Sequence, residues 1–105
     1  MKKTWKATER AVARIFKGER TSNQGLGSAV PDVVSDTYCV EVKHREKLPA
    51  WIKLMVKQAR VNGRADKLSL VVLHELNARH DDDIVLVRLG DFVEWFGEVN
   101  IDRTA

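Results

Sequence analysis

The chain has 105 residues, of which 44% are hydrophobic and 31% charged, and its formal net charge is +3 at pH 7. This length suits one domain with a hydrophobic core and is too short for two. No apolar run approaches the roughly 20 residues of a membrane span, and the start of the chain leads into an amphipathic pattern rather than an apolar signal core. We therefore expect a soluble, intracellular protein with no membrane partner.

Charge is distributed unevenly along the chain. Residues 1–67 contain 15 Lys and Arg against 7 Asp and Glu, a balance of +8, whereas residues 68–105 contain 3 against 8, a balance of −5. A basic part of this kind fits a surface that binds a polyanion, although many solvated surfaces are equally uneven.

The first half of the chain predicts one helix followed by three extended segments. Apolar side chains at helical spacing over residues 4–17 predict the helix. The extended segments are expected at residues 19–22, 32–35 and 38–45, with a polar, glycine-containing loop at 23–28. The single cysteine, Cys39, lies in the apolar run of the last segment, so we expect a reduced, buried thiol.

The second half predicts a helix, two strands and a short helix. Pro49 is placed to begin the helix, and Gly63 is placed to cap its end. The apolar runs at 68–74 and 84–89 are typical of central strands covered on both faces. Asp91 is a candidate N-cap of the last helix. The whole order predicts an α/β fold in which helices flank a mixed central β-sheet.

Several charged residues stand where apolar residues would be expected. Glu9 falls on the apolar stripe of the first helix, so its carboxylate should face the core. Alternation along the strand puts Glu41, Lys43 and Arg45 on one face, and Asp32 begins a neighbouring strand. Buried carboxylates are costly unless paired or bound to a cation, which favours a divalent metal. The alternative is a structural ion-pair network in which Glu41 pairs with Lys43 or Arg45.

These residues carry a family resemblance. The pattern PD at 31–32, eight residues and then EVK at 41–43, preceded by a helix bearing Glu9, resembles the PD-(D/E)XK nuclease superfamily. Within it, ATERAVARIFKGERTS and PDVVSDTYCVEVKHRE are similar to archaeal-type Holliday junction resolvases. EVKHREKLPAWIKLMVKQA, LVVLHE and DDDIVLVRLGDF are similar to small nucleases of this type carried by bacteriophages. The resemblance implies a restriction-endonuclease-like α-β-β-β-α-β core in a single nuclease domain over residues 1–105.

The resemblance also implies roles for individual residues. Asp32 and Glu41 would ligate Mg²⁺ together with the Val42 carbonyl oxygen, and Mn²⁺ would substitute. Lys43 would orient or help deprotonate the attacking water, and Glu9 would hold a second metal or a metal-bound water. The implied reaction is in-line hydrolysis of a phosphodiester, with the metal as Lewis acid and water activator.

Further residues are weaker candidates. Gln58 on the second helix is expected either to reach back to the metal site or to be a satisfied core amide. Candidate DNA contacts are Arg20, Arg45 and a loop serine, Ser22 or Ser28, for which simple loop polarity is the alternative.

Other polar residues favour structural interpretations. His44 should face the side opposite Lys43 and be packed. The cationic stripe that contains Arg60 favours a solvated surface. His80 with the three aspartates that follow resembles a metal cluster, but its place in a tight connection favours a solvated turn.

The expected function is that of a Mg²⁺-dependent, structure-selective DNA endonuclease, namely a Holliday junction resolvase. It is expected to act in the cytoplasm, which would be the cytoplasm of the host cell if the chain is phage-encoded. A nuclease for flaps, nicks or other branched DNA is the alternative within the fold, and a non-catalytic DNA-binding or assembly module is the alternative from another class. Paired cuts in a four-way junction require two symmetry-related sites, so we expect a homodimer. Trp51, Trp95 and Phe96 are candidate interface residues.

Overall fold

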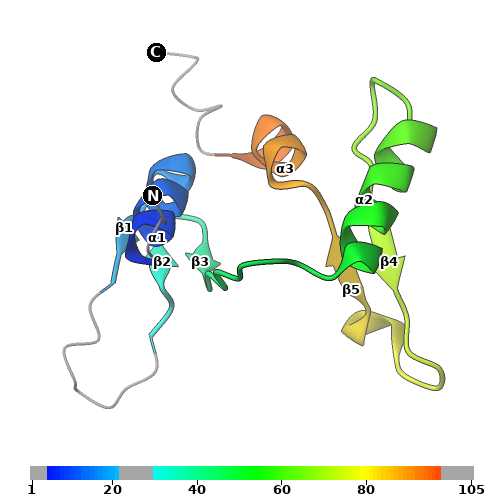
Figure 1. Ribbon diagram of the computed structural model, residues 1–105, viewed down its shortest axis with the longest axis horizontal. Helices are drawn as coiled ribbons and strands as arrows, with labels where there is room; N and C mark the ends of the chain where they lie inside the picture. The colour runs from blue at the N-terminus through cyan, green and yellow to red at the C-terminus, as the bar shows by residue number, and fades with distance from the viewer. Residues whose placement is uncertain (1–4, 22–29, 98–105) are drawn as a thin grey trace. The chain divides into compact units, whose positions relative to one another are not determined.

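A computed structural model describes residues 5–21 and 30–97 of the chain, which form a mixed α/β architecture (Figure 1). The elements in chain order are α1 (Trp5–Phe16), β1 (Glu19–Arg20), β2 (Val33–Val34), β3 (Cys39–Val40), α2 (Ala50–Asn62), β4 (Val71–Leu73), the 3₁₀ turn η1 (His80–Asp82), β5 (Ile84–Leu86) and α3 (Leu89–Phe96). Among these residues the strands form two antiparallel sheets, β1-β2-β3 and β4-β5.

The chain divides into two compact units. The first unit comprises Met1–Glu46 and Phe96–Ala105, and the second comprises Lys47–Trp95. The first contains α1 and the three-stranded sheet, and the second contains α2, the two-stranded sheet and nearly all of α3. The single nuclease domain over residues 1–105 stays a prediction.

In the first unit, α1 packs against β1 and β2 (Figure 1). Its buried residues are Glu9, Ala13 and Phe16, which the helical period places on one face. The Gly18 N–H closes the helix by donating to the Ala13 carbonyl oxygen over 2.8 Å. A Cβ at Gly18 would lie 2.4 Å from the carbonyl oxygen of Val34. The missing side chain therefore lets the end of α1 approach β2 closely.

The register of β2 and β3 decides which of their side chains are covered. Val33 pairs with Val40, and Val34 pairs with Cys39. Val33 is fully buried at 0% exposure, whereas Val34 is 38% exposed. Opposed residues in an antiparallel pair share a face, so Cys39 lies outward beside Val34. The prediction of a buried thiol is therefore wrong, because Cys39 is exposed.

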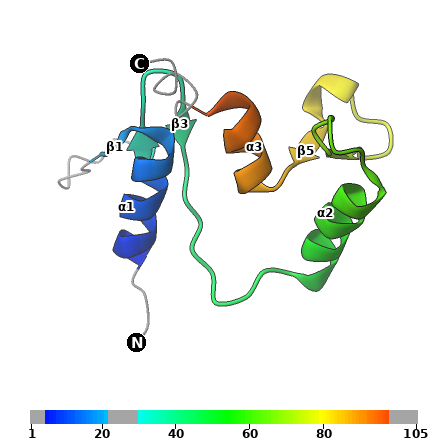
Figure 2. The ribbon, with the colours of Figure 1, turned by 90° about the horizontal axis from the view of Figure 1, so that it is seen from above.

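Both predicted strands are shorter in the structure than in the sequence pattern. β2 and β3 have two residues each, and residues 41–49 have no regular secondary structure. The chain leaves β3 as an extended coil (Figure 2). The prediction that Glu41, Lys43 and Arg45 share one face of a strand is therefore wrong, since that alternation requires a continuing ladder.

In the second unit, α2 begins after Pro49 and ends at Gly63, as predicted. The Gly63 N–H donates to the carbonyl oxygen of Arg60 over 3.3 Å. The half-buried residues Ile52, Val56 and Ala59 form its covered face, and the helix contacts β4. None of the helices in the described ranges has both the length and the apolar character that a bilayer crossing requires.

The two-stranded sheet differs from the prediction of central strands. Val71 pairs with Leu86 and Leu73 with Ile84. Val72 is 57% exposed and Ile84 58% exposed, so the sheet is not covered on both faces within the described residues. The apolar runs reflect strand propensity more than burial, because a sheet of two strands with one helix against it has an uncovered face.

The predicted N-cap of the last helix is also wrong. α3 begins at Leu89, which places Asp91 inside its first turn rather than before it. A carboxylate in the first turn still interacts favourably with the helix dipole.

Candidate active site

Glu9 is the buried charged residue at the centre of the candidate site. It is 8% exposed and projects from the covered face of α1, which confirms its predicted core-facing position. Arg20, on β1, donates from Nε to Glu9 Oε1 over 3.0 Å. The Arg20 side chain is 31% exposed, so the carboxylate is shielded while its partner reaches solvent. Arg20 was predicted as a DNA contact, and the structure assigns it this intramolecular partner.

Two open hollows in the first unit meet at Glu9. One, of about 510 Å³, places Glu9 beside Asp32, Arg20 and Lys6. The other, of about 340 Å³, is lined by Glu9, Trp5 and four consecutive residues, Val42, Lys43, His44 and Arg45. The fold therefore brings the helix glutamate beside Asp32 on one side and beside the Val42–Lys43 segment on the other.

The link between Asp32 and the Glu41–Lys43 segment follows from the strand register. Since Val33 pairs with Val40, extending the ladder by one position sets Asp32 opposite Glu41. The Val42 N–H donates to Asp32 Oδ2 over 2.7 Å. This N–H is therefore bonded to a side chain and not to the backbone of the neighbouring strand, as it would be if the β2–β3 pairing continued. Pro31, the next residue on the β2 side, has no N–H to offer. The strand pairing therefore ends where the predicted site begins.

Glu41 and Lys43 are paired with each other. Lys43 Nζ lies 3.5 Å from Glu41 Oε2, and the side chains are 69% and 57% exposed, respectively. This is the pair that the ion-pair alternative predicted. Because both groups are solvated, their placement costs little free energy, whereas the burial of the Glu9 carboxylate is costly.

The three predicted metal-binding carboxylates do not converge on one point. Within the described residues, the one group of at least three potential ligand side chains whose atoms lie within 4.8 Å of one another is His74, His80 and Asp83. Mg²⁺ bonds of about 2.1 Å in octahedral geometry need adjacent ligand oxygens about 3 Å apart. Glu9, Asp32 and Glu41 supply the hard oxygen atoms that Mg²⁺ prefers, but not at this spacing.

Of the remaining predicted residues, Gln58 belongs to the second unit and Arg45 to the first. Gln58 is exposed on α2, so its interpretation as a core amide is wrong. Arg45 is exposed and donates from Nη1 to the His44 carbonyl oxygen over 3.0 Å. Ser22 and Ser28 lie outside the described residues.

His44 was predicted to be packed away from Lys43. It is exposed and lines the same hollow as Lys43, and its Nδ1 lies 2.8 Å from Thr8 Oγ1. The absence of strand geometry at residues 41–45 explains the error, because adjacent coil residues need not point to opposite sides.

In the second unit, Arg60 forms an ion pair with Asp91, which the prediction of a solvated surface did not include. Its Nε donates to Asp91 Oδ2 over 2.7 Å, and Arg88 Nη1 donates to Asp91 Oδ1 over 2.9 Å. The hydrogen bond from Arg60 lowers the pKa of Asp91 below its ordinary 3.8, and partial desolvation acts in the opposite direction. The 31-residue separation of Arg60 and Asp91 left no local signal for this pair.

Comparisons of the chain with protein-family models, with curated proteins and with solved structures found no match.

Proposed function

We propose that the chain is a Mg²⁺-dependent, structure-selective DNA endonuclease with a restriction-endonuclease-like core, and that it cuts four-way junctions. The observation that carries the proposal is the position of Glu9, a shielded carboxylate between the hollow that contains Asp32 and the hollow that contains Val42 and Lys43. Burying a carboxylate costs free energy, so a shielded carboxylate that lines two hollows is a candidate functional group.

The role proposed for each residue follows from its position and its functional group. Asp32 and Glu41 would hold Mg²⁺ with the Val42 carbonyl oxygen, and the bound ion would polarise the phosphate and activate water. Lys43 carries an exposed ammonium close to Glu41, where it can orient water and offset charge on the phosphate. Arg45, Arg20 and Lys6 place cations around the same hollows, as contacts to a DNA backbone require.

Ligand binding in this proposal requires local rearrangement. Glu41 must leave its pair with Lys43 and approach Asp32, which the register sets opposite it. Both side chains of the pair are exposed, and residues 41–45 are held by no strand, so the cost of this movement is small.

A second candidate function is a DNA-binding or assembly module without catalysis. The specific observation in its favour is that Glu9 and Glu41 already have cationic partners, Arg20 and Lys43, and that the carboxylates are not grouped around one point. A structural ion-pair network would have this arrangement.

Cleavage of an end-labelled four-way junction and of linear duplex, with Mg²⁺ and with EDTA, separates the two functions. Asp32→Asn is the informative variant, because the Asn side-chain oxygen can still accept from the Val42 N–H while the charge is lost. Asp36→Asn, at an exposed turn position, is the matched control. We expect Mg²⁺-dependent junction cutting in the wild type and the control, and a loss of roughly 100-fold or more in Asp32→Asn with junction binding retained.

Junction binding without cutting in Mg²⁺ or Mn²⁺ would favour the binding module. Cutting by Asp32→Asn at the wild-type rate would reject the assigned site. Equal cutting of linear duplex and junction would reject structure selectivity.

A further inference from the structure

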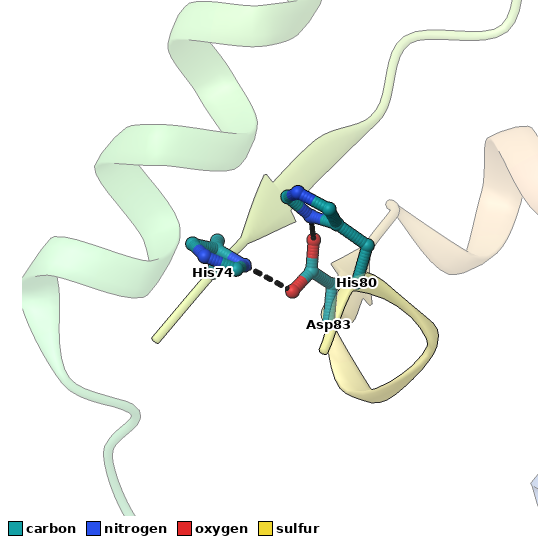
Figure 3. A group of neighbouring side chains, drawn as sticks. All are labelled: His74, His80 and Asp83. Carbon is teal, nitrogen blue, oxygen red and sulfur yellow. Dashed lines mark hydrogen bonds and ion pairs between the residues drawn. The ribbon is translucent and has the colours of Figure 1, made fainter. Parts of the chain in front are cut away.

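A cluster of two histidines and one aspartate lies at one end of the β4–β5 pair. His74 directly follows β4, Asp83 directly precedes β5, and His80 begins the turn η1. Figure 3 shows both imidazole rings directed at the Asp83 carboxylate, one on each of its oxygens. None of these residues belongs to the site proposed for DNA cleavage.

The backbone brings the three residues together. Leu73 pairs with Ile84, so the next position of the ladder sets His74 opposite Asp83 on the same side of the strands. The Asp83 N–H donates to the His80 carbonyl oxygen over 3.0 Å, which closes η1 and turns residue 80 back towards residue 83. The backbone pairing of the strands and the geometry of the turn therefore place the three side chains close together.

The distances are close to those of a metal site. His74 Nδ1 lies 2.6 Å from Asp83 Oδ1, and His80 Nδ1 lies 3.2 Å from Asp83 Oδ2. Four ligands at about 2.1 Å in tetrahedral geometry are about 3.4 Å apart. One ligand atom from each of the three residues lies within 4.8 Å of the other two, so this spacing requires only small side-chain movements. The His80 side chain is 84% exposed and the His74 side chain 37% exposed, so both have room for the adjustment.

Charge at the cluster favours a cation. The rings of His74 and His80 are stacked with centroids 4.4 Å apart. The Asp83 side chain is only 11% exposed, and the histidines are its hydrogen-bond partners. Residues 74–83 carry four carboxylates against one arginine, a balance of −3 with neutral histidines. A bound dication would offset most of this negative charge.

We propose that His74, His80 and Asp83 bind a first-row transition-metal dication such as Zn²⁺. Two imidazole nitrogens with one carboxylate oxygen are a donor set for Zn²⁺ and its neighbours, whereas Mg²⁺ prefers oxygen ligands alone. Three protein ligands leave a coordination position for water or an external ligand. Binding ties the β4–β5 connection to the strand ends, and it is independent of the nuclease proposal.

Titration of the full, tag-free chain with Zn²⁺ alone tests the site, with heat of binding and melting temperature as readouts. The chain has three histidines, and the third, His44, lies in the first unit, so His44→Gln is the matched control for His80→Gln. We expect one Zn²⁺ per chain and a raised melting temperature in the wild type and His44→Gln. In His80→Gln we expect affinity to fall at least about 10-fold and the thermal shift at the same Zn²⁺ concentration to be smaller.

Because His80 is exposed, its substitution should not impair folding, and circular dichroism before titration verifies this. Co²⁺ provides a second readout, since its visible absorption reports ligand geometry and should be lost in Asp83→Asn. No saturable Zn²⁺ binding by the wild type would overturn the proposal, as would equal affinity in the wild type and His80→Gln. Displacement of Zn²⁺ by an equal concentration of Mg²⁺ would also overturn it.

Discussion

At the scale of single residues, Glu9 shows how a structural pair and a functional group can coincide. Its carboxylate is shielded and accepts from Arg20, so its charge is compensated within the fold. Removing one member of a shielded pair is costly when the other is left buried and unpaired. Arg20 is partly exposed and can turn to water, so this cost is reduced here.

Substitution of Glu9 by Gln should therefore separate activity from stability. The amide retains a hydrogen-bond acceptor for Arg20 but cannot supply the charge that a metal or a metal-bound water requires. We expect DNA cleavage to fall by roughly 100-fold with little change in melting temperature, measured against Glu19→Gln at an exposed position of β1. Full activity per folded molecule in Glu9→Gln would remove Glu9 from the site.

The Arg60–Asp91 pair should make the free energy of unfolding depend on pH in the acidic range. The pKa of Asp91 is lower in the folded chain than its ordinary 3.8, so the unfolded chain binds the proton more readily. The contribution is therefore fully present above about pH 4 and is lost as the pH falls through the folded pKa.

We expect Asp91→Asn to melt a few degrees below the wild type at pH 7, with the difference shrinking below about pH 4. Asp66→Asn is the control, because Asp66 is 77% exposed and its ammonium partner Lys67 is 4.0 Å away. Melting curves recorded between about pH 2.5 and pH 7 measure the difference in melting temperature between each variant and the wild type. A difference that persists unchanged at pH 2.5 would contradict the assignment to the carboxylate charge.

At the scale of elements, β2 offers a matched pair of substitutions. Val33 is fully buried and Val34 is 38% exposed, although they are adjacent and chemically identical. Val33→Ala should lower the free energy of unfolding by about 1–3 kcal/mol through lost burial and a cavity. Val34→Ala should change it by less than about 0.5 kcal/mol. Urea unfolding of both variants tests the register. A larger effect of Val34→Ala than of Val33→Ala would mean that β2 presents the other face, and equal effects would contradict the difference in burial.

Element type was more predictable than element extent. The helices over residues 5–16 and 50–62 agree with the sequence because helical periodicity and the Pro49 and Gly63 signals are local. The strand predicted over 38–45 is limited to Cys39–Val40, because strand length depends on a partner far along the chain. A side chain and a proline interrupt that partner at Asp32 and Pro31.

At the scale of the whole molecule, the proposed junction cleavage requires two active sites. Each chain has one set of Glu9, Asp32, Glu41 and Lys43, so paired symmetric cuts imply a two-fold dimer. Trp51, Trp95 and Phe96 are 51%, 45% and 54% exposed, so they are available as interface residues.

We expect the protein to have a mass in solution near twice 11.9 kDa, measured by light scattering at micromolar concentration. Mixing wild-type subunits with Lys43→Ala subunits should give junctions nicked on one strand, because each site cuts one strand. A strict monomer that still makes paired symmetric cuts would contradict the dimer and favour a nuclease for flaps or nicked duplex.

Local sequence patterns were sufficient to predict the order of helices and strands, the core-facing position of Glu9 and the ends of α2, because each of these depends on residues close together in the chain. The folded arrangement was needed to establish which strand faces are covered, that Arg20 pairs with Glu9, and that Glu41 pairs with Lys43 in solvent. The fold also places His74 next to His80 and Asp83. The sequence pattern had indicated only His80 and the three aspartates that follow it as a possible metal cluster. These features depend on register and long-range contacts, which side-chain periodicity does not encode.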